Sequence, residues 1–108
     1  MKRFWLASLI GVGLFFGGIG MASGADLKRG EELFRRHCSF CHPDGRNTIR
    51  PEKNLKRDTL IKNGITSPEG IVERMRRPGP GMPAFSKERI SPEDAESIAH
   101  YVWETFKD

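Results

Sequence analysis

The chain has 108 residues, with 18 basic and 14 acidic side chains and a net charge of +4. Two of the basic residues, Lys2 and Arg3, belong to an N-terminal segment unlike the rest, and without them the net charge falls to +2. So small an excess argues against a protein that binds nucleic acid, which needs a basic surface. The remaining residues, 26–108, are enough for one domain.

Residues 1–25 have the pattern of a secretory signal peptide. Lys2 and Arg3 form a positive start, residues 4–21 carry no charge, and small residues follow up to position 25. We therefore predict export to the periplasm with removal of residues 1–25, and cleavage after Ala22 fits the pattern nearly as well. A retained membrane anchor stays open as an alternative, because about 18 apolar residues can just span a bilayer. Five glycines in the apolar run weaken it as a permanent helix.

The first predicted helix of the mature chain covers residues 27–37. Asp26 is a good N-cap, and residues behind it recur at helical spacing, namely Leu27, Gly30, Phe34 and His37. The next segment, residues 43–53, is polar and rich in turn-forming residues, so we expect a loop there.

Three further helices are predicted, and no strand is needed. A short helix should cover residues 56–62 and end at Asn63-Gly64 with a left-handed cap. Ser67-Pro68-Glu69 gives the start signals of a helix that Pro78 ends. Ser91 and Pro92 open the last helix, whose apolar stripe consists of Ala95, Ile98, Ala99, Val102 and Phe106.

The two cysteines stand as Cys38-Ser39-Phe40-Cys41, with His42 directly after them. Two thiols one helical turn apart can add to the two vinyl groups of one haem, and the adjacent imidazole then falls under the iron. A redox dithiol would need a βαβ context, a structural zinc site would need a second pair of ligands, and a plain disulfide would not explain His42. We predict one haem c attached through Cys38 and Cys41, with His42 as an iron ligand.

The second iron ligand is predicted to be Met82. It lies in a proline- and glycine-rich loop, residues 78–83, which cannot form a helix or a strand and can hold a sulfur in place at little entropic cost. Met75 lies on the apolar side of a predicted helix, where methionine more often fills the core. His37 and His100 are further candidates for this ligand, and both are expected to be solvent-facing helix residues.

These residues resemble the class I c-type cytochromes, and most closely the cytochrome c6 branch. The resemblance covers nearly the whole mature chain and is carried by residues 30–34, 38–42, 47–55, 81–85 and 98–102. It implies an all-α fold, a small cytochrome c fold in which the N- and C-terminal helices cross around one covalently bound haem. It also implies that Gly30 and Phe34 meet Ile98 and Tyr101 at the crossing.

The resemblance further implies that the Pro51 carbonyl accepts a hydrogen bond from the second ring nitrogen of His42. Two departures from the pattern of the branch count against a photosynthetic role for this chain and against the usual reduction potential of the branch. Residues 74–77 replace a region where photosynthetic members usually carry a glutamine, and residues 78–80 are unusually rich in proline.

The function predicted from these features is one-electron transfer between redox proteins, with no enzymatic activity and no small-molecule substrate. Two different functions stay open: a haem enzyme or sensor with a displaceable sixth ligand, and a redox module anchored to a membrane by its leader. Arginines near the ligand segments predict a partner with an acidic docking surface, namely Arg46, Arg74, Arg76 and Arg77.

Overall fold

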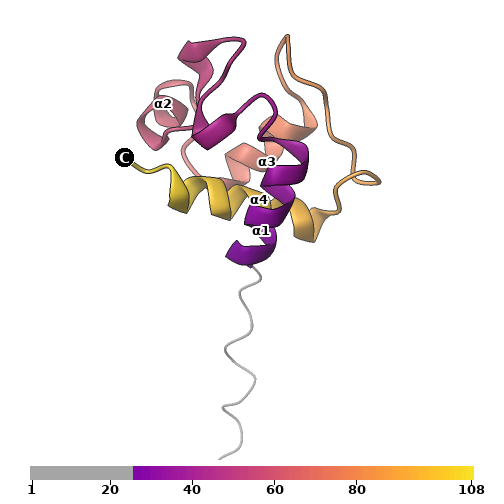
Figure 1. Ribbon diagram of the computed structural model, residues 1–108. Helices are drawn as coiled ribbons and strands as arrows, with labels where there is room; N and C mark the ends of the chain where they lie inside the picture. The colour runs from indigo at the N-terminus through magenta and orange to yellow at the C-terminus, as the bar shows by residue number, and fades with distance from the viewer. Residues whose placement is uncertain (1–25) are drawn as a thin grey trace, which may run out of the picture.

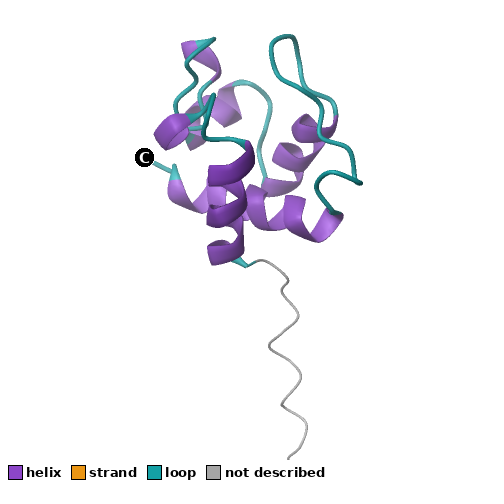
Figure 2. Cartoon of the chain, turned by 45° about the vertical axis from the view of Figure 1, so that its right-hand side comes forward, coloured by secondary structure: helices purple, strands orange, loops and turns teal. Residues whose placement is uncertain are grey.

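The computed structural model describes residues 26–108, and the predicted signal peptide, residues 1–25, lies outside the described residues. Within residues 26–108 there is no strand, so the predicted all-α class is confirmed (Figures 1 and 2). No helix in this range is long and apolar enough to cross a membrane. The helices are α1 (Leu27–His37), α2 (Arg57–Lys62), α3 (Pro68–Arg76) and α4 (Pro92–Thr105).

Side-chain caps set the starts of α1, α3 and α4, as the sequence predicted. Asp26, Ser67 and Ser91 each accept a hydrogen bond from the backbone N–H three residues on, at 3.0, 3.3 and 3.2 Å. Each bond satisfies one of the N–H groups that a helix start leaves unpaired. These three helix starts therefore follow from local chemistry.

The segment predicted as a loop between α1 and α2 contains two short 3₁₀ turns, at Pro43–Gly45 and Pro51–Lys53. Each turn begins with a proline, whose fixed φ angle suits a tight turn. After α2, Gly64 has a φ of +89°, which is the left-handed conformation predicted there.

The two terminal helices, α1 and α4, cross in close contact (Figure 1). Gly30 permits the approach, because a Cβ at this position would lie 2.1 Å from the Ser97 carbonyl oxygen and 2.8 Å from Tyr101 Cβ. The ring of Phe34 lies 5.5 Å from that of Tyr101, centroid to centroid. The predicted crossing is confirmed, with Ser97 rather than Ile98 as the closest neighbour of Gly30.

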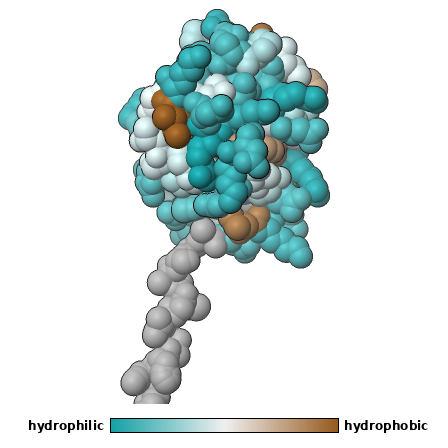
Figure 3. All heavy atoms as spheres, turned by 90° about the vertical axis from the view of Figure 1, so that its left-hand side faces the viewer, coloured by the Kyte–Doolittle hydropathy of each residue, from teal (hydrophilic) through white to brown (hydrophobic). Residues whose placement is uncertain are grey.

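The core joins all four helices and the segment between α3 and α4. Met75 belongs to it and is only 4% exposed, as expected of a methionine on the apolar side of a helix. On the face shown in Figure 3, hydrophilic side chains dominate and the hydrophobic areas are small and separate. The buried apolar residues are Leu33, Phe34, Leu60, Ile65, Ile71, Met75, Phe85, Ile90, Ala95, Ile98, Ala99 and Val102.

Arg76, at the end of α3, stabilises the segment that leads to α4. Its Nη1 donates hydrogen bonds to the carbonyl oxygens of Phe85 and Ile90, at 3.0 and 2.9 Å. The sequence suggested that Arg76 steers a redox partner, but its guanidinium is engaged with the protein's own backbone. The role of this arginine is therefore structural.

We expect Arg76→Leu to destabilise the fold by about 2–3 kcal/mol, because two partly buried carbonyls lose a charged donor. Urea denaturation followed by circular dichroism measures the change. The matched control is Arg77→Leu, whose exposed side chain pairs with Glu73 on the surface and should shift stability by about 0.5 kcal/mol or less. Equal losses in the two variants would contradict this role.

Candidate functional site

A cavity of about 300 Å³ opens beside the end of α1. Its walls come from all four helices, the segment between α1 and α2, and the loop that follows α3. Cys38, Cys41, His42 and Met82 all line it, whereas Pro51 does not. The fold therefore brings four of the five predicted site residues to one cavity.

The two cysteines lie on turns that continue α1. The Cys38 N–H donates to the Phe34 carbonyl at 2.8 Å, and the His42 N–H donates to the Cys38 carbonyl at 2.9 Å. This spacing places both thiols on the cavity wall, and both are free. Phe40, between them, is 93% exposed.

The thiol of Cys38 is not that of a redox-active dithiol. Burial, with a smaller contribution from the nearby Cys41, raises the pKa of Cys38 to about 12. Redox-active cysteines need the opposite shift, because the thiolate is the nucleophile. Two thiols in an apolar wall next to an imidazole instead fit a covalently held haem.

One ring nitrogen of His42 is already bonded to the protein. Nδ1 donates to the Arg46 carbonyl oxygen at 2.9 Å, which leaves Nε2 as the nitrogen able to bind a metal. Burial lowers the pKa of His42, and the hydrogen bond to Arg46 offsets part of that shift. The net effect favours the neutral ring that metal coordination requires.

The prediction that Pro51 accepts this hydrogen bond is wrong. The Pro51 carbonyl accepts from the Asn54 side chain at 3.1 Å. The chain turns back directly after His42, because Asp44 and Gly45 adopt φ angles of 54° and 82°. This tight turn brings the Arg46 carbonyl to the imidazole before the chain reaches Pro51.

The structure separates the candidates for the second iron ligand. Met75, Met82 and His37 line the cavity, whereas His100 does not. Met75 lies on the buried face of α3 and packs in the hydrophobic core. Met82 is half-buried on the loop after α3 and directly follows Gly81, whose φ is +94°. Met82 as the ligand remains a prediction.

His37 is not the freely solvated residue that the sequence indicated. Its ring lies edge-on to Phe85, with 6.1 Å between the centroids, and it lines the cavity. Burial, followed by the charges of Arg36 and Arg89, lowers the pKa of His37.

Asn47 is a site residue that sequence reasoning missed. Its Oδ1 accepts hydrogen bonds from the backbone N–H groups of Ile49 and Arg50, at 2.9 and 2.8 Å. Its Nδ2 donates to the Lys53 carbonyl at 3.1 Å. One side chain thus shapes the loop on this side of the cavity. The signals in the sequence were an asparagine among turn-forming residues and its place in the segment 47–55 that carries the resemblance.

Basic side chains also line the cavity. The sequence singled out Arg74, but it did not place Lys53 or Arg89 at the site. Arg89 lies over the Phe85 ring at 4.9 Å, a contact between a loop and the core that no local pattern indicates. The four basic residues of the cavity lining are Arg50, Lys53, Arg74 and Arg89.

Comparison with known proteins gives consistent similarities. Residues 25–102 match a family described as "Cytochrome C oxidase, cbb3-type, subunit III". The chain is 39% identical over 89 residues to cytochrome c6 of Gracilaria tenuistipitata var. liui, covering 82% of each chain. It is 37% identical over 103 residues to cytochrome c6 of a Nostoc species, covering 94% of this chain and 92% of that cytochrome.

A solved structure with a similar fold is the outer membrane cytochrome F of Geobacter sulfurreducens. It shares 48% sequence identity and a TM-score of 0.70, and the match covers 71% of this chain and 98% of that one.

Proposed function

The chain belongs to the class I c-type cytochromes, near the cytochrome c6 branch, and on that premise we propose that it is a periplasmic carrier with His42 and Met82 as iron ligands. It is a monohaem electron-transfer protein with one covalently bound haem c, not an enzyme, and it acts with redox partner proteins. The expected family and the expected haem are confirmed. The identity of the two iron ligands, the cleavage of the leader and the position of the docking surface are proposals.

The observation that carries the proposal is that Cys38, Cys41, His42 and Met82 line one cavity. The haem supplies a one-electron couple there, and a thioether ligand raises its potential relative to two imidazoles. The chain's own residues hold the site in one geometry. Arg46 fixes the His42 ring through Nδ1, the loop around Met82 holds the sulfur, and apolar core side chains limit access of water.

The absorption spectrum of protein produced in a host that attaches haem tests this proposal. We expect a low-spin haem that does not bind carbon monoxide, because both axial positions are filled. A high-spin spectrum with ready carbon monoxide binding would favour a haem enzyme or sensor instead.

We also propose that residues 1–25 are cleaved on export and that residues 26–108 form the cytochrome domain. The residues around position 25 fit a small-x-small cleavage rule. The mass of the native protein should therefore correspond to a chain that begins at Asp26. A full-length chain would support a membrane-anchored redox module, a function that the matched oxidase-subunit family makes relevant.

The proposed docking surface surrounds the cavity. Phe40 and Ile49, 93% and 58% exposed, are both part of the cavity lining and offer apolar contact area. The basic lining residues Arg50, Lys53 and Arg74 give the same region a positive charge. Such a surface suits a partner with an acidic rim around an apolar centre.

We expect the double variant Arg50→Gln and Lys53→Gln to slow electron transfer to an acidic partner several-fold at low salt, because charge steering raises association rates. The salt dependence of the rate, measured by stopped flow, should flatten as well. The control is Lys62→Gln with Lys107→Gln, the same charge change at exposed residues outside the cavity lining. An unchanged salt dependence in the first variant would contradict the docking surface.

A further inference from the structure

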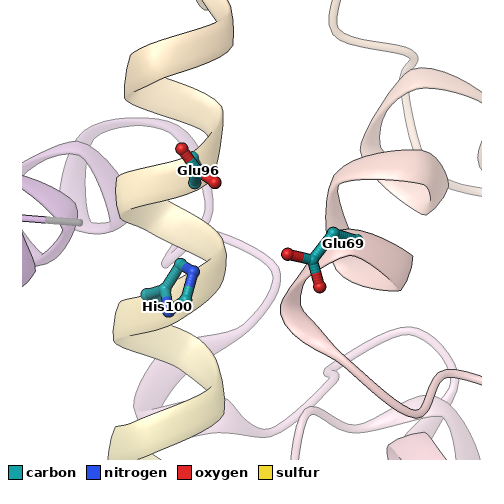
Figure 4. Close-up of side chains that lie close together, drawn as sticks. All are labelled: Glu69, Glu96 and His100. Carbon is teal, nitrogen blue, oxygen red and sulfur yellow. The ribbon is translucent and has the colours of Figure 1, made fainter. Parts of the chain in front are cut away.

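Three side chains that could hold a metal ion meet between α3 and α4 (Figure 4). Glu69 comes from the first turn of α3, and Glu96 and His100 come from α4. One carboxylate oxygen of each glutamate and one ring nitrogen of His100 all lie within 4.8 Å of one another. Figure 4 shows the Glu69 carboxylate pointing across the gap toward the two side chains of α4.

The identity and spacing of these residues suit a transition metal. Glu96 and His100 are four positions apart, which places them on one face of the helix, the spacing used by helical zinc-binding pairs. An imidazole with two carboxylates is a donor set that zinc accepts. Calcium and magnesium prefer oxygen ligands alone, so the histidine argues against them.

Within residues 26–108, the three side chains make no hydrogen bond or ion pair with another protein group, so their donor atoms can take up a metal ion. Two carboxylates held this close repel each other unless a cation lies between them. Both glutamates, but not His100, line a groove of about 400 Å³, which leaves space beside the two carboxylates for a metal and its water.

The cations nearest the groove do not replace a metal ion. Arg76 lines it, but its Nη1 donates to the carbonyls of Phe85 and Ile90. Lys87 also lines the groove and is exposed, and it makes no ion pair with either glutamate in the described part of the chain.

We propose that Glu69, Glu96 and His100 bind one Zn²⁺ ion that links α3 to α4, with water completing the coordination. The site is separate from the haem cavity, whose lining includes none of these three residues. Zinc binding is therefore independent of the proposed electron transfer. Because the metal joins two helices, it stabilises the folded state.

Calorimetric titration of the tag-free haem protein with ZnCl₂ near neutral pH tests the proposal. We expect one Zn²⁺ per chain and a rise of the thermal midpoint on adding zinc. His100→Ala and Glu69→Gln should each weaken binding by at least about tenfold, because each removes one of three protein ligands. Lys87→Gln should tighten binding, because it removes a positive charge from the wall of the groove that repels the metal ion.

The matched control is Glu52→Gln, the same chemical change at an exposed residue of the Pro51–Lys53 turn, which should bind zinc as the wild type does. Circular dichroism and the haem spectrum verify that each variant is folded. If His100→Ala binds zinc as tightly as the wild type, or if the wild type shows no stoichiometric binding, the proposal is overturned. NMR provides a second measurement, since zinc should shift the His100 ring signals ahead of those of His37.

Discussion

Met82→Leu should abolish the thioether–iron charge-transfer absorption of the oxidised protein and lower its reduction potential by on the order of 0.1 V or more, since axial ligands tune haem potentials over about 0.8 V. Leucine keeps the volume of methionine and removes the sulfur, so the loop can keep its packing. The iron, left without its methionine ligand, should also bind carbon monoxide. Visible spectroscopy and a redox titration measure all three effects.

Met75→Leu is the matched control for the Met82 variant. Met75 is 4% exposed in the core, and a methionine-to-leucine exchange there should cost less than about 1.5 kcal/mol. Its spectrum and potential should stay close to those of the wild type. If Met75→Leu lost the thioether band and Met82→Leu kept it, the assignment of the ligand would be reversed.

Gly30→Ala should destabilise the protein by about 3 kcal/mol or more, at the upper end of what overpacking costs. The new methyl group would meet the Ser97 carbonyl oxygen, a backbone atom of α4 that cannot rotate away, at 2.1 Å. The helices would have to move apart and open the core beneath them. Thermal unfolding followed by circular dichroism measures the loss.

Glu32→Ala is the control for placing an alanine in α1, because Glu32 lies on the exposed side of the same helix. Its stability should change by about 0.5 kcal/mol or less. If Gly30→Ala unfolded at the same temperature as the wild type, the close approach of α1 and α4 would not be needed for stability.

Features governed by neighbouring residues could be read from the sequence. Asp26, Ser67 and Ser91 act on N–H groups three positions away, so the starts of three helices were predictable. The haem motif is equally local, because Cys38, Cys41 and His42 span little more than one helical turn.

Features that depend on the exact path of the backbone, over short or long separations, were missed or misassigned. The partner of His42 depends on the left-handed turn at Asp44 and Gly45, and the sequence pattern pointed to Pro51 instead. In the sequence, Arg76 cannot be distinguished from a surface arginine. Only the folded chain brings the Phe85 and Ile90 carbonyl oxygens within hydrogen-bond distance of its guanidinium.

The candidate zinc ligands illustrate the same limit. Glu69 is far from Glu96 and His100 along the chain, and only the packing of α3 on α4 brings the three together. The sequence predicted a solvent-facing His100 and gave no reason to pair it with Glu69.

The crossing of α1 and α4 also sets when the fold can close. The Asp26 N–H and the Ser97 hydroxyl that meet there are 71 positions apart, so closure must wait for the C-terminal end of the chain. During synthesis the N-terminal part of the chain is made first, so Cys38 is present before α4. If the chain folded before haem was attached, burial would raise the pKa of the Cys38 thiol to about 12 and leave less of the reactive thiolate. The order of the helices along the chain therefore favours attachment of haem before the last helix docks.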